Sequence, residues 1–349
     1  MTATARALLC VASCCACTAP VSAPPLPHLA RTIPMPGIAG AGGGRLDHLD
    51  YDRTTGRLFL AAVGCDSLEV IDLRAGRHLQ RIAELPEPQG VAVVPRAGAA
   101  ARVFVGCGGD GSVRAYDAAS LAALGSVFAG DDADNVHWDP RTARVWVGCG
   151  GARGGAVVAI DPETMAVVAH TELPAHAEGF RLDEASARMF VNVPGADGGA
   201  AVLLADRERG AVEATCRLRG AAANFPLCHV AALHAVLLVC RDPSVLLVLD
   251  DRTGDELARV SCVADGDDVF FDEATGNVLV IGGEGGLEVF AMPARGTLQR
   301  VGVVPLPPRA RTGLLVSERR ALYVAVPRQQ DGTDAAVLEF LLDPGASAR

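Results

Sequence analysis

Lysine is absent from this sequence, and all 31 positive charges other than histidine come from arginine. A lysine Schiff base and a Walker-type phosphate loop are therefore excluded, because both depend on a lysine ammonium group. The chain also contains neither a G-x-S-x-G nucleophile elbow nor an H-E-x-x-H zinc motif. The sequence consequently supports neither a serine hydrolase of that type nor a zincin protease.

The chain also lacks an excess of positive charge. Its formal net charge is −10, and it contains no basic cluster. A nucleic-acid partner is not expected, because binding DNA or RNA requires a basic surface that neutralises phosphates. Beyond the N-terminal leader no stretch approaches the ~20 apolar residues that a transmembrane helix needs, so we expect no transmembrane segment.

Aromatic residues make up only 4% of the chain, whereas hydrophobic residues as a whole make up 50%. The packing is therefore expected to rest on valine, leucine and alanine, which gather in short apolar strand cores that recur along the chain. A fixed period of about 44 residues, with several short strands in each repeat, is typical of a β-propeller. The seven cores are centred on residues 59, 104, 146, 190, 237, 279 and 323.

Each repeat predicts four strands, so the expected fold class is all-β: a seven-bladed β-propeller with four-stranded antiparallel blades. In the second repeat the strands are expected at 90–94, 103–105, 112–116 and 124–128. The seventh repeat ends after its third strand, and the N-terminal segment 29–34 resembles the fourth strand of the first repeat. We therefore expect the N-terminal strand to complete the last blade and close the ring, which leaves no open sheet edge.

The first 23 residues do not fit the repeat and predict an export leader, which leaves residues 24–349 as a single propeller domain. One arginine precedes a short apolar run followed by small residues, as in a secretory signal. The segment 11–14 also resembles a bacterial lipobox, in which Cys14 would carry a lipid anchor. The expected location is periplasmic, membrane-anchored as a lipoprotein, or extracellular, and the mature protein is expected to be a monomer.

Polar residues stand directly before the first strand of each repeat. In a propeller this innermost strand lines the central channel, so residues at its start converge on the axis at one face. The loops between the second and third strands reach the same face and add Arg241. The candidate ligand-binding residues of this face are His48, Gln89, Asn135, His176, Asn224, Arg241, Asp268 and Arg311.

Four carboxylates at this face share one register, each five residues before a second acidic residue. Carboxylates and amides that converge on one point are how proteins hold hard divalent cations. Ca²⁺ or Mg²⁺ is therefore the one cofactor that the sequence indicates. Histidines near carboxylates could instead do acid–base work, and His48 and His176 are the candidates. The candidate metal ligands are Asp47, Asp134, Glu178 and Asp267.

The second acidic set is expected in the turns that follow the innermost strands. Acidic residues at such positions accept hydrogen bonds from loop amides, so these residues should cap turns. The first set could do the same, but its polar identity varies between repeats, whereas a purely structural role should repeat identically. Close carboxylates there should raise at least one pKa unless a cation or Arg311 compensates. The second set is Asp52, Asp139, Asp183 and Asp272.

These features resemble the YVTN-type, YncE-like family of seven-bladed propellers over about residues 29–342. The resemblance implies an exported propeller, and related propellers include calcium-dependent lactonases, streptogramin lyases and NHL-repeat binding modules. Their catalytic sets do not map onto this sequence, so no catalytic role carries over. The phrases that carry the likeness are GRLDHLDYD at 44–52, PQGVAVVP at 88–95, DADNVHWDP at 132–140, NFPLC at 224–228, DGDDVFFDEATGNVLVIGGEG at 265–285 and ARTGLLV at 310–316.

Two functions from different classes follow. The first is an exported propeller that binds a small molecule or a protein partner at the polar channel face. The second is a metal-dependent hydrolase or lyase, lactonase-like, that uses the carboxylate and amide ring at the channel mouth. Tightly bound Ca²⁺ or Mg²⁺ in the purified protein would favour the enzyme.

Overall fold

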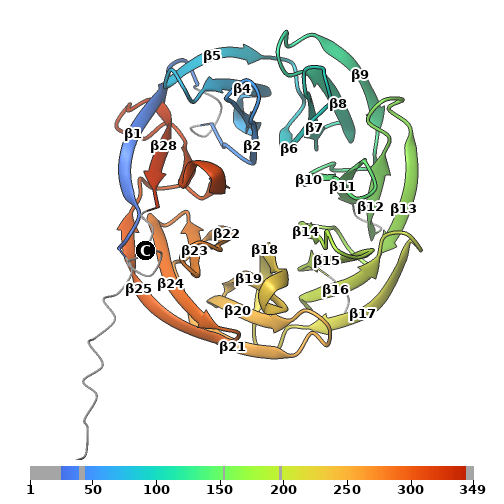
Figure 1. The fold of residues 1–349 in the computed structure, drawn as a ribbon, viewed down its shortest axis with the longest axis vertical. Helices are drawn as coiled ribbons and strands as arrows, with labels where there is room; N and C mark the ends of the chain where they lie inside the picture. The colour runs from blue at the N-terminus through green and yellow to red at the C-terminus, as the bar shows by residue number, and fades with distance from the viewer. Residues whose placement is uncertain (1–24, 39–43, 152–153, 196–198, 343–349) are drawn as a thin grey trace, which may run out of the picture.

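The computed structural model describes residues 25–38, 44–151, 154–195 and 199–342. Seven sheets of four antiparallel strands stand around a central axis as the blades of a propeller (Figure 1). The predicted fold class is thereby confirmed. The predicted leader, residues 1–23, lies outside the described residues. Among those that are described, no helix combines the length and the apolar character needed to cross a membrane.

The strands of blades 1 to 6 follow one another in chain order within each sheet. Blades 1 and 2 consist of β2 (Leu49–Asp52), β3 (Arg57–Ala62), β4 (Ser67–Asp72), β5 (Arg77–Ile82), β6 (Pro88–Val94), β7 (Arg102–Cys107), β8 (Ser112–Asp117) and β9 (Ala123–Phe128). Blades 3 and 4 consist of β10 (Val136–Asp139), β11 (Arg144–Gly151), β12 (Gly154–Ile160), β13 (Val167–Leu173), β14 (Gly179–Leu182), β15 (Arg188–Val193), β16 (Ala201–Asp206) and β17 (Ala211–Arg217).

Blades 5 and 6 continue the same order. They consist of β18 (Ala222–Val230), β19 (Ala235–Asp242), β20 (Ser244–Asp250), β21 (Glu256–Ser261), β22 (Gly266–Asp272), β23 (Asn277–Gly282), β24 (Gly286–Ala294) and β25 (Thr297–Pro305). Blade 7 combines both ends of the chain, in β26 (Thr312–Val316), β27 (Ala321–Val326), β28 (Ala335–Leu341) and β1 (His28–Met35). Short 3-10 helices occur at η2 (Val63–Cys65), η3 (Ala231–Leu233) and η4 (Ser317–Arg319).

The recurring strand cores of the sequence all fall in the second strand of a blade. Their seven central residues are at most 2% exposed. Seven apolar clusters hold the ring together, and each cluster is built from two neighbouring blades. Because these clusters hold the blades, the polar residues at the channel are not needed for packing.

The N-terminal strand closes the ring, as the sequence predicts. β1 pairs antiparallel with β28, from His28 opposite Leu341 to Met35 opposite Ala335. Ile33 and Met35 are fully buried in the cluster between blades 7 and 1. β1 and β28 lie side by side in Figure 1, at the opposite ends of its colour scale.

The second acidic set caps turns, also as predicted. Each of the four carboxylates accepts a hydrogen bond from the backbone N–H two residues further on, at 2.9 to 3.3 Å. These bonds fix the turn after each of four innermost strands. They therefore hold the ends of the strands whose beginnings carry the candidate site.

Candidate functional site

A cavity of about 280 Å³ lies at one end of the central channel and receives side chains from all seven blades. Eleven of the twelve candidate residues line it. Equivalent positions in a ring of repeats face one another across the axis, which is why residues so far apart in sequence converge. These eleven are Asp47, His48, Gln89, Asp134, Asn135, His176, Glu178, Arg241, Asp267, Asp268 and Arg311.

Asn224 is the exception. Its side chain is fully buried and donates to Asn192 Oδ1 and to the Ala201 carbonyl, each at 3.0 Å. The register of β18 shifts between Asn224 and Leu227, and such an irregularity redirects the side chains beside it. Phe225 and Pro226 line the cavity instead.

Glycines allow the innermost strands to approach one another closely around the cavity. A Cβ atom on Gly179 would lie 2.4 Å from the Phe225 carbonyl oxygen, and one on Gly90 would lie 2.0 Å from the Asp134 carbonyl oxygen. Both distances are shorter than any tolerable contact, so only glycine fits at these positions. The innermost strands therefore pack closely against one another beside the cavity.

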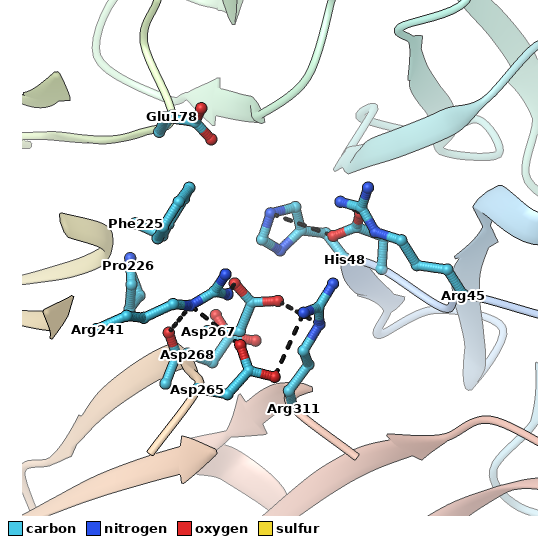
Figure 2. A network of polar contacts seen from close by, with 12 residues as sticks. Arg45, His48, Glu178, Phe225, Pro226, Arg241, Asp265, Asp267, Asp268 and Arg311 are labelled. Carbon is cyan, nitrogen blue, oxygen red and sulfur yellow. Dashed lines mark hydrogen bonds and ion pairs between the residues drawn. The ribbon is translucent and has the colours of Figure 1, made fainter. Parts of the chain in front are cut away.

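Two arginines and two aspartates form a compact cluster on one side of the cavity (Figure 2). Arg311 Nε lies 2.8 Å from Asp267 Oδ2, and Arg241 Nε lies 3.2 Å from Asp265 Oδ1. Arg241 also pairs with Asp267 and places its guanidinium 4.2 Å from the centre of the Phe225 ring. Burial raises the pKa of Asp267, although Arg311 and Arg241 oppose that shift. This is the Arg311-centred pairing that the sequence offered as an alternative to a cation.

A second arginine contact neutralises Asp47. Arg45 Nη2 donates to Asp47 Oδ2 at 2.6 Å, and His48 Nε2 lies 3.7 Å from Asp47 Oδ1. Burial lowers the pKa of His48, but the carboxylates of Asp47, Asp268 and Asp134 outweigh it, so the pKa is raised above its usual value. Blade 1 therefore contributes to the cavity wall an arginine and a histidine whose pKa is raised.

The opposite side of the cavity carries carboxylates without an arginine. Asp134 is 8% exposed, and among the described residues no donor hydrogen-bonds to its carboxylate and no cationic side chain forms an ion pair with it. Among the described residues the ion-pair partner of Glu178 is His176, whose Nδ1 lies 3.7 Å from Glu178 Oε1, and Arg241 acts on Glu178 from a greater distance. Asp132 accepts from Gln89 Nε2 at 2.9 Å. This side, from blades 3 and 4, is therefore short of positive charge.

The pKa values on this side follow from that shortage. Burial raises the pKa of Asp134 well above its usual range, and the nearby charge of Asp47 adds to the effect. Burial also raises the pKa of Glu178, which His176 opposes and Asp132 reinforces. A raised carboxyl pKa was expected from the sequence, and these are the groups that a cation would help to ionise.

A second cavity continues the channel below the first and shares four side chains with it, those of His48, Asn135, Arg181 and Asp268. These residues form the floor of the first cavity. Arg181 Nη1 donates to His137 Nε2 and to the Phe180 carbonyl, each at 2.9 Å. Asp268 Oδ2 accepts from the backbone N–H of Gly313 at 2.7 Å.

Asp268 should make the stability of the protein depend on pH. Burial raises its pKa to about 7, from an ordinary value of 3.8, and the charge of His48 acts against that rise. The folded protein then holds a proton that the unfolded chain releases, so stability falls as pH rises from about 4 to about 7. Asp268→Asn should remove this contribution, worth about 1 kcal/mol per pH unit, in urea unfolding across that window.

The exposed residue Glu213 provides the control for this measurement, as Glu213→Gln. Its stability should follow the wild-type pH dependence. Parallel curves for wild type and Asp268→Asn would show that Asp268 is ionised throughout, contrary to this prediction.

Ion pairs to arginine compete with metal binding at the predicted ring of carboxylate ligands. Two of its four ligands, Asp47 and Asp267, are already paired with arginines. In the described part of the chain, no group of three or more His, Cys, Asp or Glu side chains is arranged to hold a metal ion. The divalent cation stays a prediction, confined to the carboxylates of Asp134 and Glu178.

Three charged lining residues were not among the candidates predicted from the sequence: Arg45, Asp132 and Arg181. Arg181 belongs to a recognisable position, two residues before a turn-capping aspartate. Asp50 and His137 occupy the same position in blades 1 and 3 and line the second cavity. The polar character of this position was the signal that could have identified it.

Comparisons with known proteins support the fold. Hydrazine synthase from Kuenenia stuttgartiensis superposes with a TM-score of 0.74 at 14% identity, over 86% of this chain and 96% of that one. A chain of the mitotic checkpoint complex superposes with a TM-score of 0.72 at 16% identity, over 98% and 99% of the two chains. No family model and no curated protein matches the sequence, so membership of the YncE-like family stays a prediction.

Proposed function

We propose that this protein is an exported propeller that binds a small, positively charged polar molecule at the channel mouth. The observation that carries the proposal is the Asp134 carboxylate, which is 8% exposed, lines the cavity and forms no ion pair with any cationic side chain of the described residues, so that only the more distant charge of His48 opposes its raised pKa. Burying a carboxylate without compensation costs free energy. A cationic ligand would offset that cost.

The charge distribution directs such a ligand to one side of the cavity. Asp47 and Asp267 form ion pairs with arginines, whereas Asp134, Glu178 and Asp132 form none with any arginine that the structure describes. The cavity volume of about 280 Å³ suits a small molecule better than a protein segment. Export forms part of the proposal because the predicted leader supports it.

A thermal-shift panel of alkylammonium and guanidinium salts, with CaCl₂ and MgCl₂, tests this function. At least one of these cations should raise the melting temperature of the wild type. Asp134→Asn and Glu178→Gln should each weaken its binding by about tenfold or more, since a hydrogen bond to a charged group contributes about 1.5–3 kcal/mol. Binding by Glu213→Gln should match the wild type, and a wild type that responds to none of these cations would refute the proposal.

The second candidate, a metal-dependent hydrolase or lyase, rests on the same two carboxylates. No arginine forms an ion pair with Asp134 or Glu178 within the described part of the chain, which leaves both carboxylates available to Ca²⁺ or Mg²⁺. A stoichiometric metal ion in the purified protein, lost in Asp134→Asn, would favour this candidate. A response to organic cations but not to Ca²⁺ or Mg²⁺ would favour the binding protein.

A further inference from the structure

Arg181 differs from the other three arginines of the cavity. Each of those pairs with an aspartate, whereas no carboxylate in the described part of the chain forms an ion pair with Arg181. Its only hydrogen bonds there go to the His137 ring and to the Phe180 carbonyl, both from Nη1. The Nε and Nη2 groups donate to no acceptor among the described residues. A guanidinium with free donors is well suited to bind a carboxylate.

His137 does not neutralise this charge. An arginine N–H donates to its Nε2, so that nitrogen carries a lone pair and no proton. Burial, together with the charges of Arg181 and His48, lowers the pKa of His137 well below its usual range. The imidazole is therefore neutral, and it holds Arg181 in place without compensating it.

The other charged groups at the floor of the cavity do not compensate Arg181 fully. His48 has the same sign when it is protonated. Asp268 has the opposite sign, but one of its oxygens accepts from Gly313, and its pKa of about 7 leaves it only partly ionised at neutral pH. Arg181 thus lies at the boundary between the two cavities without a carboxylate in ion-pair contact among the described residues.

Charges of opposite sign that take part in no arginine–carboxylate ion pair among the described residues therefore lie on neighbouring parts of one wall. Glu178 directly precedes β14, and Arg181 is the third residue of that strand, so their Cα atoms are separated by about 10 Å of extended chain. Gly179 lies between them on the cavity wall and presents no side chain. Figure 2 shows Glu178 standing apart from the cluster of Arg241, Asp265, Asp267 and Arg311.

We infer that the ligand of this cavity is a zwitterion, whose cationic group binds Asp134 and Glu178 and whose carboxylate binds Arg181. The inference rests on the proposed function, because it assigns the positive end of the ligand to the same carboxylates. It adds a second anchor, which a simple cation would leave unused. A chain of a few methylene groups between the two charges would fit the separation of Glu178 and Arg181.

Isothermal titration calorimetry of the full chain tests the inference with probes of graded length. The zwitterions are γ-aminobutyrate, 5-aminovalerate and 6-aminohexanoate, and the single-charge probes are the amine and the carboxylate of each matching chain length. At least one zwitterion should bind about tenfold or more tightly than its matching amine. Arg181→Gln should reduce that zwitterion to the affinity of the amine, and Arg181→Lys should restore part of the difference.

Arg209→Gln is the matched control, because Arg209 is 75% exposed. It should keep the wild-type preference for the zwitterion. If the amine binds wild type as tightly as the zwitterion, or if folded Arg181→Gln keeps the preference, the inference is overturned while cation binding at Asp134 stands. If neither amines nor zwitterions bind, both the inference and the proposed cationic ligand are overturned. If Arg181→Gln fails to fold, the comparison of zwitterion and amine binding to the wild type still tests the inference.

Discussion

Deletion of residues 24–36 should unfold the protein or strongly lower its melting temperature. The deletion removes β1, and with it Ile33 and Met35, which are both 0% exposed. Truncating one such side chain costs about 2–5 kcal/mol, so losing both approaches the whole stability of a typical domain. The deletion also exposes β28 as an unpaired edge strand. Thermal unfolding of residues 24–349 and of the truncated protein, followed by circular dichroism, measures the effect.

Point substitutions within β1 make this prediction sharper. Ile33→Ala should cost about 2–5 kcal/mol in urea unfolding, because Ile33 packs between blades 7 and 1. Leu29→Ala, in the same strand, should change stability by less than about 0.5 kcal/mol, since Leu29 is 52% exposed. A truncated protein that melts at the temperature of residues 24–349 would show that blade 7 is stable without its outer strand.

Ring closure could be predicted from the sequence because the evidence for it is local. The segment 29–34 resembles an outer strand but precedes the first repeat, whereas the seventh repeat lacks an outer strand. The extra strand at the start of the chain therefore matches the strand missing at its end. The period itself is visible because every repeat needs one buried strand, whose central residue is apolar in all seven blades. The apolar pattern is imposed by packing between blades, and five of the seven central residues are aromatic although aromatic residues make up only 4% of the chain.

The position of the candidate site could be predicted from the sequence, but the ion pairs within it could not. Repeat symmetry brings the starts of the innermost strands together, and eleven of the twelve candidate residues do line one cavity. The ion-pair partner of each charged residue depends on how far its side chain extends toward neighbouring blades, which the spacing of residues in the sequence does not show. Arg311 of blade 7 and Arg241 of blade 5, for example, both pair with Asp267 of blade 6. Asn224 was misplaced for a related reason, because the irregular register of β18 is a backbone feature that the residue pattern does not show.

Arg207 and Asp139 form a buried ion pair that the sequence pattern of turn-capping aspartates does not predict. Asp139 was expected only to cap a turn, but its Oδ2 also lies 2.9 Å from Arg207 Nε, and both side chains are 0% exposed. The remaining guanidinium donors reach the carbonyls of Arg188 at 2.7 Å and Asp183 at 3.1 Å. The pair joins the end of β10 in blade 3 to the residue after β16 in blade 4.

Replacing Arg207 should therefore be the most damaging single substitution outside the apolar clusters. Arg207→Met keeps much of the side-chain volume but leaves the Asp139 carboxylate buried without its cation. Breaking a buried pair in this way costs about 3–5 kcal/mol, which urea unfolding of the variant should show. Arg209→Met, at an arginine that is 75% exposed, should stay within about 0.5 kcal/mol of the wild type.

The double variant Arg207→Met/Asp139→Asn distinguishes the effect of the buried Asp139 charge on stability from the effect of the turn that Asp139 caps. The introduced asparagine side chain would still accept from the Arg141 N–H, which Asp139 accepts at 3.0 Å, so the turn should survive while the uncompensated charge disappears. The double variant should therefore be more stable than Arg207→Met alone by about 1 kcal/mol or more, a coupling that independent sites do not show. If Arg207→Met is as stable as wild type, the turn amides alone satisfy Asp139 and the link between blades 3 and 4 is apolar. If the double variant is no more stable than Arg207→Met, the loss comes from the Arg207 contacts to the Arg188 and Asp183 carbonyls, and the arginine acts as a backbone clamp.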